Sequence, residues 1–151
     1  MLDLKITIVS TKDSWLNIYI EEFIGRLKDY QVFWVHNIED IKEGDIAFFL
    51  GFEKIVGKEV LTRHRNNLVV HESNLPQGRG MSPMTWQILE GKNKVPITIF
   101  EMNEELDSGY IYLQDMMYFK GTELIDDIRR KQAKYTFRLC LKFLEKYPKI
   151  L

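Results

Sequence analysis

The chain has 151 residues, the length of one ordinary domain, and its 45% hydrophobic and 28% charged residues are typical of a globular protein. Its 21 Lys and Arg residues nearly balance 22 Asp and Glu residues, which leaves a formal net charge of -1. This balance gives no basic field to attract a nucleic acid backbone or an anionic membrane, so neither is expected as a partner.

The N-terminal residues run directly into a strand-like segment, and no run reaches the ~18 to 20 apolar residues that a membrane span needs. We therefore expect a cytoplasmic protein in which residues 1–151 form one domain. Cys140, the single cysteine, lies in a helical apolar pattern and is expected to be a packed thiol.

The first half of the chain alternates between strand-like and helix-like segments. Residues 4–9 are rich in β-branched side chains and predict a strand, which turn and cap residues separate from the next segment. Residues 15–27 place apolar side chains at three- and four-residue spacing, which predicts an amphipathic helix. The same reasoning predicts strands at 32–35, 45–50 and 68–71, with a crossover helix at 53–63.

The second half continues this alternation. It predicts helices at 84–89 and 123–147, strands at 97–100 and 110–113, and a weaker edge strand at 116–119. Repeated strand and helix units predict an α/β fold of three layers, with a mostly parallel twisted sheet and helices on both faces. Ligands of such folds lie at the carboxyl ends of the strands, so functional residues should follow the strands directly.

One such position is His71, at the end of a predicted buried strand. The loop after it contains two prolines and two glycines between residues 76 and 83, together with Arg79. Stiff backbone, exposed amide groups and a planar cation are typical of a loop that binds an anion or another ligand. A structural turn beside a core histidine is the alternative interpretation.

Two linked motifs resemble the folate-dependent formyltransferases. The first is His71-x-Ser73-x-Leu75-Pro76-x-x-Arg79-Gly80-x-x-Pro83, followed by Trp86 and Leu89-Glu90-Gly91. The second is a strand resembling residues 97–100, followed by an Asp-x-Gly turn that Asp107-Ser108-Gly109 matches. The resemblance covers roughly residues 45–115 and implies a Rossmann-like formyltransferase fold.

The resemblance implies a catalytic cluster of Asn, His and Asp that acts on 10-formyltetrahydrofolate and a primary amine. His71 would donate a hydrogen bond to the oxyanion that forms when the amine attacks the formyl group. Asp107 would accept the proton of the amine and orient the imidazole. The family's asparagine lies two residues before the histidine, where this chain has Val69, so Asn74 or a loop backbone amide would substitute for it.

The resemblance also implies where the two substrates bind, with 10-formyltetrahydrofolate as a co-substrate and no metal. For the folate we expect contacts from Leu50, Gly51, Phe52, Ile55 and Gly109. For the acceptor we expect contacts from Ser73, Arg79, Gly80, Lys12 and Trp15. In the last helix, Gln132 and Thr136 are candidates for the border of the acceptor site, and its apolar stripe is either core or part of a homodimer contact.

Family acceptors include methionyl-tRNA, glycinamide ribonucleotide and nucleotide-linked amino sugars. The neutral charge, and the lack of residues for a further C-terminal β-barrel domain, argue against tRNA. Val69 and the sequence His-Glu-Ser-Asn-Leu-Pro resemble the amino-sugar enzymes of pseudaminic acid-type synthesis. The expected acceptor is thus a nucleotide-linked 4-amino-4,6-dideoxy sugar, presumed to carry uridine diphosphate.

Three alternatives stay open: a non-catalytic folate- or nucleotide-binding module, a hydrolase that releases formate, and transfer to another small amine such as glycinamide ribonucleotide. His36 and His64 lie in charged, loop-like sequence without a second ligand at metal spacing. We therefore expect both histidines at the surface.

Overall fold

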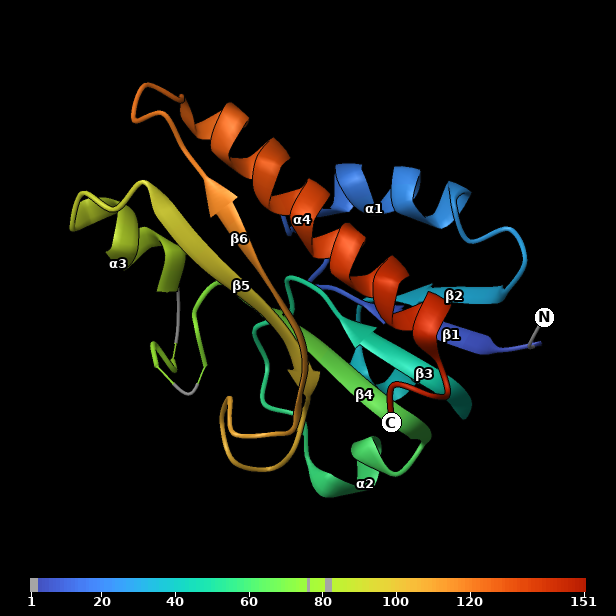
Figure 1. Ribbon diagram of the computed structural model, residues 1–151. Helices are drawn as coiled ribbons and strands as arrows, with labels where there is room; N and C mark the ends of the chain where they lie inside the picture. Colours follow the sequence, from blue (N-terminus) through green and yellow to red (C-terminus); the bar gives the residue numbers. More distant parts are fainter. Residues whose placement is uncertain (1–2, 76, 81–82) are drawn as a thin grey trace. The chain divides into compact units, whose positions relative to one another are not determined.

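The computed structural model describes residues 3–75, 77–80 and 83–151. Figure 1 shows the course of the chain. In chain order its elements are β1 (Lys5–Val9), α1 (Asn17–Gly25), β2 (Gln31–Val35), the 3-10 turn η1 (Ile38–Asp40), β3 (Gly44–Phe49), α2 (Lys58–Leu61), β4 (His64–His71), α3 (Pro83–Leu89), β5 (Lys94–Glu101), β6 (Ile111–Tyr118) and α4 (Ile125–Lys146). The strands form a six-stranded sheet in the order β2-β1-β3-β4-β5-β6. The predicted α/β class with a mostly parallel sheet is thereby confirmed.

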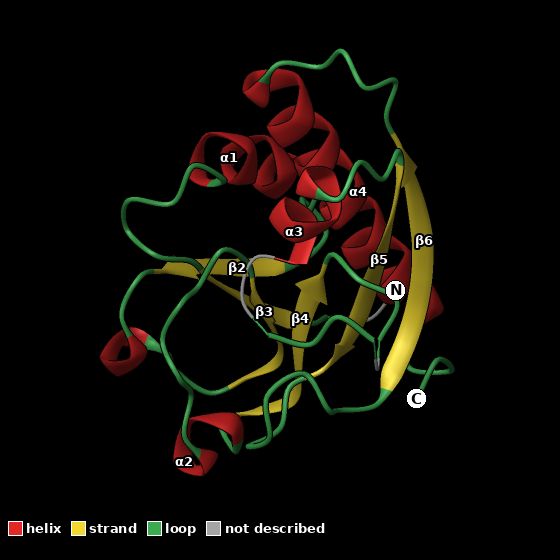
Figure 2. Cartoon of the chain, turned by 90° about the vertical axis from the view of Figure 1, so that its left-hand side faces the viewer, coloured by secondary structure: helices red, strands yellow, loops and turns green. Residues whose placement is uncertain are grey.

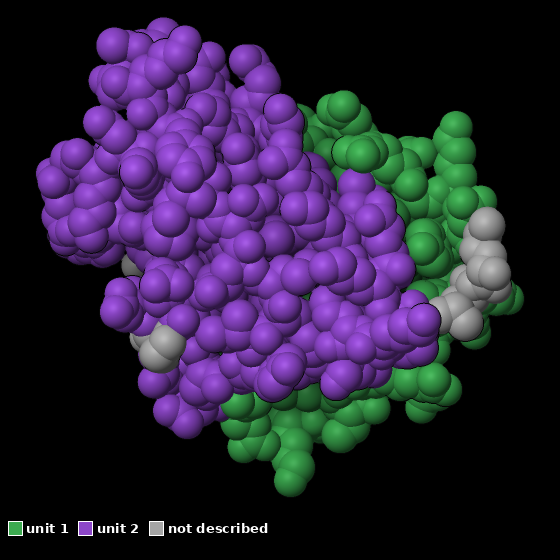
Figure 3. Space-filling model, in the orientation of Figure 1, with its two compact units in different colours: residues 1–69, 102–104 green, residues 70–101, 105–151 purple. Residues whose placement is uncertain are grey.

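The chain divides into two compact units, which Figure 3 colours green and purple. Unit 1 comprises residues 1–69 and 102–104, and unit 2 comprises residues 70–101 and 105–151. Strand β4 passes from the first unit into the second at residue 70, so that its last two residues, Val70 and His71, belong to unit 2.

Unit 1 is built on parallel strands. β1 pairs with β2 on one side and β3 on the other, and β3 pairs in parallel with β4. The buried side chains of β1 and β3 are apolar apart from Thr7, as expected for parallel strands covered on both faces. One apolar cluster of this unit consists of Val9, Ile41, Ala47, Phe49, Val56 and Val60.

Unit 2 contains the antiparallel pair β5 and β6, which run beside each other in Figure 2. Helix α4 packs along this pair (Figure 1). Its buried face carries Ala133, Thr136, Phe137, Leu139, Cys140, Phe143 and Leu144. The expectation that Cys140 is a packed thiol is confirmed, since its side chain is fully buried. Within the described residues, no helix is long and apolar enough to cross a membrane.

The predicted crossover helix at 53–63 is wrong in extent, because only Lys58–Leu61 is helical. Gly57, directly before the helix, has an extended backbone, and residues 50–57 between β3 and α2 are not helical. β4 conversely begins four residues earlier than the predicted strand at 68–71. Those four residues include His64, Asn66 and Asn67, which are polar yet buried, and a hydrophobic pattern does not register buried polar residues.

The two predicted strands at 110–113 and 116–119 are one strand, β6. The polar residues Gln114 and Asp115 interrupt the apolar pattern but not the pairing with β5. Gln114 lies opposite Thr98 and donates to its hydroxyl, and Asp115 lies within 3.9 Å of Arg138 of α4. Both polar side chains therefore have partners within the unit, and the strand continues through them.

Candidate functional site

Two residues 36 positions apart in sequence meet in unit 2. His71 ends β4, and its Nε2 lies 3.5 Å from Oδ2 of Asp107, with side-chain exposures of 9% and 8%. The same Nε2 lies 2.8 Å from the backbone carbonyl oxygen of Gly78. A carbonyl oxygen only accepts, so His71 donates through Nε2 and carries its proton on that atom. The structure thus brings His71 and Asp107 together, and the proton of the imidazole faces both oxygens.

The turn that carries Asp107 is held by the glycine-rich loop. Asp107 has a left-handed backbone with φ of 52°, a conformation that Asp adopts more readily than most residues. Its Oδ2 accepts a hydrogen bond of 2.8 Å from the backbone N–H of Gly80. Arg79 donates from Nε and Nη2 to the carbonyl oxygen of Leu106 and lies 3.1 Å from Glu105. The Arg79 guanidinium, expected to bind an acceptor anion, is therefore engaged by the turn.

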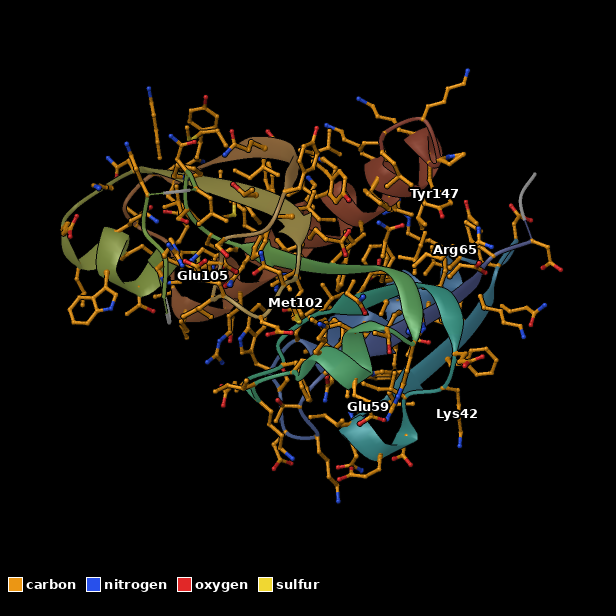
Figure 4. All side chains as sticks on the ribbon, turned by 90° about the horizontal axis from the view of Figure 1, so that it is seen from below. Lys42, Glu59, Arg65, Met102, Glu105 and Tyr147 are labelled. Carbon is orange, nitrogen blue, oxygen red and sulfur yellow. The ribbon has the colours of Figure 1, made fainter. Side chains whose placement is uncertain are left out.

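Glu105 is labelled in Figure 4 and lies in the segment between β5 and β6. Its carboxylate is 72% exposed and the Arg79 side chain 40% exposed, so this ion pair contributes little stability of its own. The two hydrogen bonds to Leu106 give the guanidinium its orientation, because a planar fork can direct both N–H groups to one oxygen.

Gly109 is required by backbone packing. A Cβ atom at this position would lie 1.6 Å from the carbonyl oxygen of Glu101 and 2.7 Å from its carbonyl carbon. Both are backbone atoms, and the N–H of Glu101 donates to the carbonyl of Tyr110 at 2.8 Å. The Asp107 turn thus closes directly onto the end of β5, and only glycine fits there. A folate contact by Gly109 stays a prediction.

The segment after His71 is tied down by buried polar contacts. Ser73 donates its N–H to the carbonyl of His71 at 3.0 Å, and the Thr98 hydroxyl donates to the carbonyl of Ser73 at 2.7 Å. Among the described residues, the buried Oγ of Ser73 has no hydrogen-bond partner. Asn74 is exposed, and its side-chain oxygen accepts from Gln114 at 3.1 Å. Asn74 is thereby directed to β6, and its catalytic role stays a prediction.

Glu72, which the sequence analysis did not single out, has contacts to two helices. Gln132 of α4 donates to Oε1 of Glu72 at 2.5 Å, and Gln87 of α3 donates to its carbonyl oxygen at 2.7 Å. Burial raises the pKa of the Glu72 carboxyl. In the sequence, only its position directly after His71 points to a role for Glu72. Its partners Gln87 and Gln132 are 15 and 60 residues away and could not be predicted from the sequence.

The expected folate residues other than Gly109 belong to unit 1. Leu50 is buried, Phe52 lies with its ring centroid 5.9 Å from that of Phe49, and Ile55 is 93% exposed. Gly51 has φ of 64°, and a Cβ there would lie 2.5 Å from the hydroxyl oxygen of Ser14. The geometry of Gly51 is therefore explained by its packing on Ser14.

The two acceptor residues expected near the N-terminus also belong to unit 1. Lys12 is exposed, and its carbonyl oxygen accepts from Asn17 at 2.9 Å. The ring of Trp15 packs edge-on against Tyr19, with centroids 6.1 Å apart. Their contact with an acceptor stays a prediction.

Val69 replaces the expected asparagine within an apolar environment. Its side chain packs against the cluster of unit 1 that contains Phe49 and Val60. The expectation of a surface position for His64 is wrong, because the residue is 4% exposed and its Nε2 lies 2.9 Å from the Thr7 hydroxyl. Gly44 leaves room for this ring, since a Cβ there would lie 2.6 Å from Nε2.

His36 is partly buried rather than exposed. Its Nδ1 donates to the carbonyl oxygen of Ser10 at 2.9 Å, and its ring packs edge-on against Trp34. Among the described residues, no group of three or more His, Cys, Asp or Glu side chains could hold a metal ion. Pro76 of the first motif lies outside the described residues.

The fold and this site define an α/β protein with a buried His-Asp pair at the end of a sheet strand. The chain belongs to the formyl transferase family, whose sequence model matches residues 34–141. Its curated relatives include the methionyl-tRNA formyltransferase of Thermotoga neapolitana, 31% identical over 103 residues, and that of Anaplasma phagocytophilum, 34% identical over 102 residues. These alignments cover 68% and 67% of this chain but 33% and 34% of the relatives, so the chain spans about a third of their length.

Solved structures share the fold. The methionyl-tRNA formyltransferase of Clostridium thermocellum is 22% identical, with a TM-score of 0.82 over 96% of this chain and 66% of that chain. The formyltransferase PseJ of Anoxybacillus kamchatkensis is 20% identical, with a TM-score of 0.67 over 97% of this chain and 76% of that chain. PseJ was solved with UDP-4,6-dideoxy-4-formamido-L-AltNAc and tetrahydrofolate.

Proposed function

We propose that the protein is a folate-dependent N-formyltransferase that moves the formyl group of 10-formyltetrahydrofolate to the amine of a nucleotide-linked 4-amino-4,6-dideoxy sugar. The observation that carries this proposal is the buried pair of His71 and Asp107, 3.5 Å apart, in a member of the formyl transferase family. That residues 1–151 constitute one catalytic domain stays a prediction.

In the proposed reaction the amine nitrogen attacks the formyl carbon, and negative charge develops on the formyl oxygen. In the structure the Nε2–H of His71 donates to the Gly78 carbonyl, and when the substrates bind it changes its hydrogen-bond acceptor from that carbonyl to the formyl oxygen. Asp107 accepts the proton that the attacking nitrogen loses, and the proton passes to N10 of the departing tetrahydrofolate. Donation from Gly80 to Oδ2 fixes the carboxylate in advance, so little reorganisation is needed during the reaction.

The buried hydroxyl of Ser73 supports a ligand at this site. A buried polar atom without a hydrogen bond costs about 1 to 3 kcal/mol, and this cost is recovered if a substrate group bonds to it. Ser73 also adjoins the loop of His71 and Gly78, since a Cβ at Gly78 would lie 2.8 Å from that of Ser73. We assign the Ser73 hydroxyl to substrate binding, in agreement with the sequence analysis.

The proposal of an amino-sugar acceptor rests on three supports. The segment around His71, with valine two residues before it, resembles the amino-sugar subgroup in sequence. PseJ, whose structure contains a UDP-linked formamido sugar, shares the fold with a TM-score of 0.67. The net charge of -1 also makes a small acceptor more suitable than a polyanion.

The curated relatives favour a second candidate acceptor. Those compared above are methionyl-tRNA formyltransferases, 31% and 34% identical to this chain. Methionyl-tRNA offers the same nucleophile, a primary amine, so the His71 and Asp107 chemistry would serve it equally. The two candidates differ in what holds the acceptor and not in the reaction.

The test is conversion of 10-formyltetrahydrofolate to tetrahydrofolate in the presence of single acceptors. The panel contains UDP-linked 4-amino-4,6-dideoxy sugars, methionyl-tRNA and glycinamide ribonucleotide, and His71→Ala is the control. We expect turnover with a UDP-linked amino sugar, abolished in the variant. Turnover with methionyl-tRNA alone would replace the first acceptor by the second.

Two further outcomes would reject formyl transfer altogether. Tight folate binding without turnover on any amine, accompanied by a large gain in rate in Val69→Asn, would indicate a binding module whose site has degenerated. Formate release without any acceptor would indicate a hydrolase. Each outcome is measured with the same folate assay and with detection of formate.

A further inference from the structure

Glu72 is an acid that the proposed roles leave unused. It follows His71 directly at the end of β4, and the residue is partly buried. One carboxyl oxygen accepts from Gln132 of α4 at 2.5 Å, and the backbone carbonyl accepts from Gln87 of α3 at 2.7 Å. Two glutamines from two helices of unit 2 thus hold one acidic residue beside His71.

The surroundings of Glu72 make its carboxylate a stronger base than an exposed one. Burial raises its pKa, and the hydrogen bond from Gln132 lowers it in part. Of the charged groups that act on it, His71 lowers the pKa and Asp107 raises it. Gln132 of α4 presents a neutral amide to the carboxylate. Arg129, three residues before Gln132, is a further charged group on that side of the helix.

The proposed reaction has a proton to dispose of that His71 and Asp107 do not account for. An aliphatic amine is chiefly an ammonium ion at neutral pH, as the pKa of about 10.4 for lysine illustrates. Its nitrogen loses two protons in becoming a formamide, and only one is needed at N10 of the leaving tetrahydrofolate. The other must leave before attack, because an ammonium nitrogen has no lone pair.

We propose that Glu72 is a second acid-base residue of the site, which binds the acceptor as an ammonium ion and takes its first proton, with Gln132 as the residue that positions the carboxyl. This inference rests on the proposed function. Gln132 donates to one oxygen of the Glu72 carboxyl, Oε1, and the backbone N–H of Glu72 also bonds to this carboxyl. We assign the other oxygen, Oε2, to the ammonium group.

The ammonium N–H bond breaks, its proton passes to the Glu72 carboxylate, and a neutral amine and a carboxylic acid result. The amine then forms a C–N bond to the formyl carbon, the bond from that carbon to N10 breaks, and the second proton reaches N10. Glu72 returns its proton to solvent, so one proton is released per formamide formed.

The experiment compares Glu72→Gln with the wild-type protein and with Glu90→Gln, which removes an exposed acid of the same unit. Formyl transfer to the UDP-linked 4-amino sugar and binding of that sugar and of its 4-hydroxy counterpart are measured from pH 6 to 9. We expect Glu72→Gln to lower kcat/KM for the acceptor by about 10²-fold or more. It should also abolish preferential binding of the amino sugar, with folate binding unchanged.

Further variants separate this role from a structural one. Glu72→Asp keeps the acid and should recover part of the rate, and Gln132→Leu removes the amide alone and should lower kcat with Glu72 in place. If Glu72→Gln does not fold, the test of the Glu72 role is the rate and the amino-sugar preference of Gln132→Leu. Wild-type values of both in Gln132→Leu would then refute that role. If the wild-type protein transfers formyl groups and Glu72→Gln keeps the wild-type kcat/KM and preference for the amino sugar, the role of Glu72 is refuted. The proposed function is then unaffected. Absence of transfer by wild type to any amine would overturn the proposed function, and this inference with it.

Discussion

Substitution of Gly109 by alanine tests whether the Asp107 turn depends on a direct backbone contact. The new Cβ would lie 1.6 Å from the Glu101 carbonyl oxygen, and real Cβ contacts are essentially never shorter than 3.0 Å. The two backbones must therefore separate by about 1.4 Å, since neither contacting atom belongs to a flexible side chain. Asp107, two residues away, has to move with the turn.

This displacement has two measurable consequences. Overpacking of this kind costs about 1 to 3 kcal/mol of unfolding free energy, to be measured by urea denaturation. A shift of about 1 Å at a catalytic group can lower the rate about 10²-fold, to be measured as folate-dependent formyl transfer.

The matched control is Gly57→Ala. A Cβ at Gly57 meets nothing within 4 Å, and the backbone φ there is -78°, which alanine adopts without strain. We expect that variant to be neutral or stabilised by up to about 1 kcal/mol, with an unchanged rate. Wild-type stability and rate in Gly109→Ala would show that the Asp107 turn does not depend on the contact with β5.

Three other predictions concern the same site and the core of unit 1. Asp107→Asn should lower the formyl-transfer rate by about 10²- to 10⁴-fold while keeping the fold, because Asn also tolerates the left-handed backbone at φ of 52°. A rate within threefold of wild type would remove Asp107 from the mechanism. Arg79→Ala should lower kcat with the acceptor KM unchanged, because the guanidinium holds the carbonyl of Leu106. If steady-state kinetics instead show a raised acceptor KM at constant kcat, Arg79 binds the acceptor. Burial lowers the pKa of His64 in the folded protein. As the pH falls below the ordinary value of 6.5, His64 is therefore protonated in the unfolded chain before it is protonated in the folded protein, and the unfolding free energy decreases. Urea denaturation at pH 7.5 and 5.5 should show a loss that His64→Gln reduces, and an equal loss in both proteins would assign the effect to other groups.

His71 and Arg79 stand out in the sequence because they lie in a stiff loop after a predicted strand, and Asp107 follows from the resemblance to a family. The structure shows the contacts of these three residues, and their roles in binding and catalysis stay predictions. The helix predicted at 53–63 is longer than the observed one, because the spacing is compatible with a helix throughout while Gly57 itself is extended and the helix begins only at Lys58. The start of β4 was missed because buried polar residues such as Asn67 look like loop.

Alternation, helical spacing and turn chemistry are all local, so the sequence sufficed to predict the α/β class and the residues that follow the strands. The contacts of these residues depend on the tertiary structure. It directs Arg79 to the turn of Asp107, gives Glu72 its partner on α4, and sets Gly109 against the backbone of Glu101. The reason is physical: a hydrogen bond or a close contact between segments 8 to 60 residues apart depends on how the chain closes, and no local pattern encodes that distance.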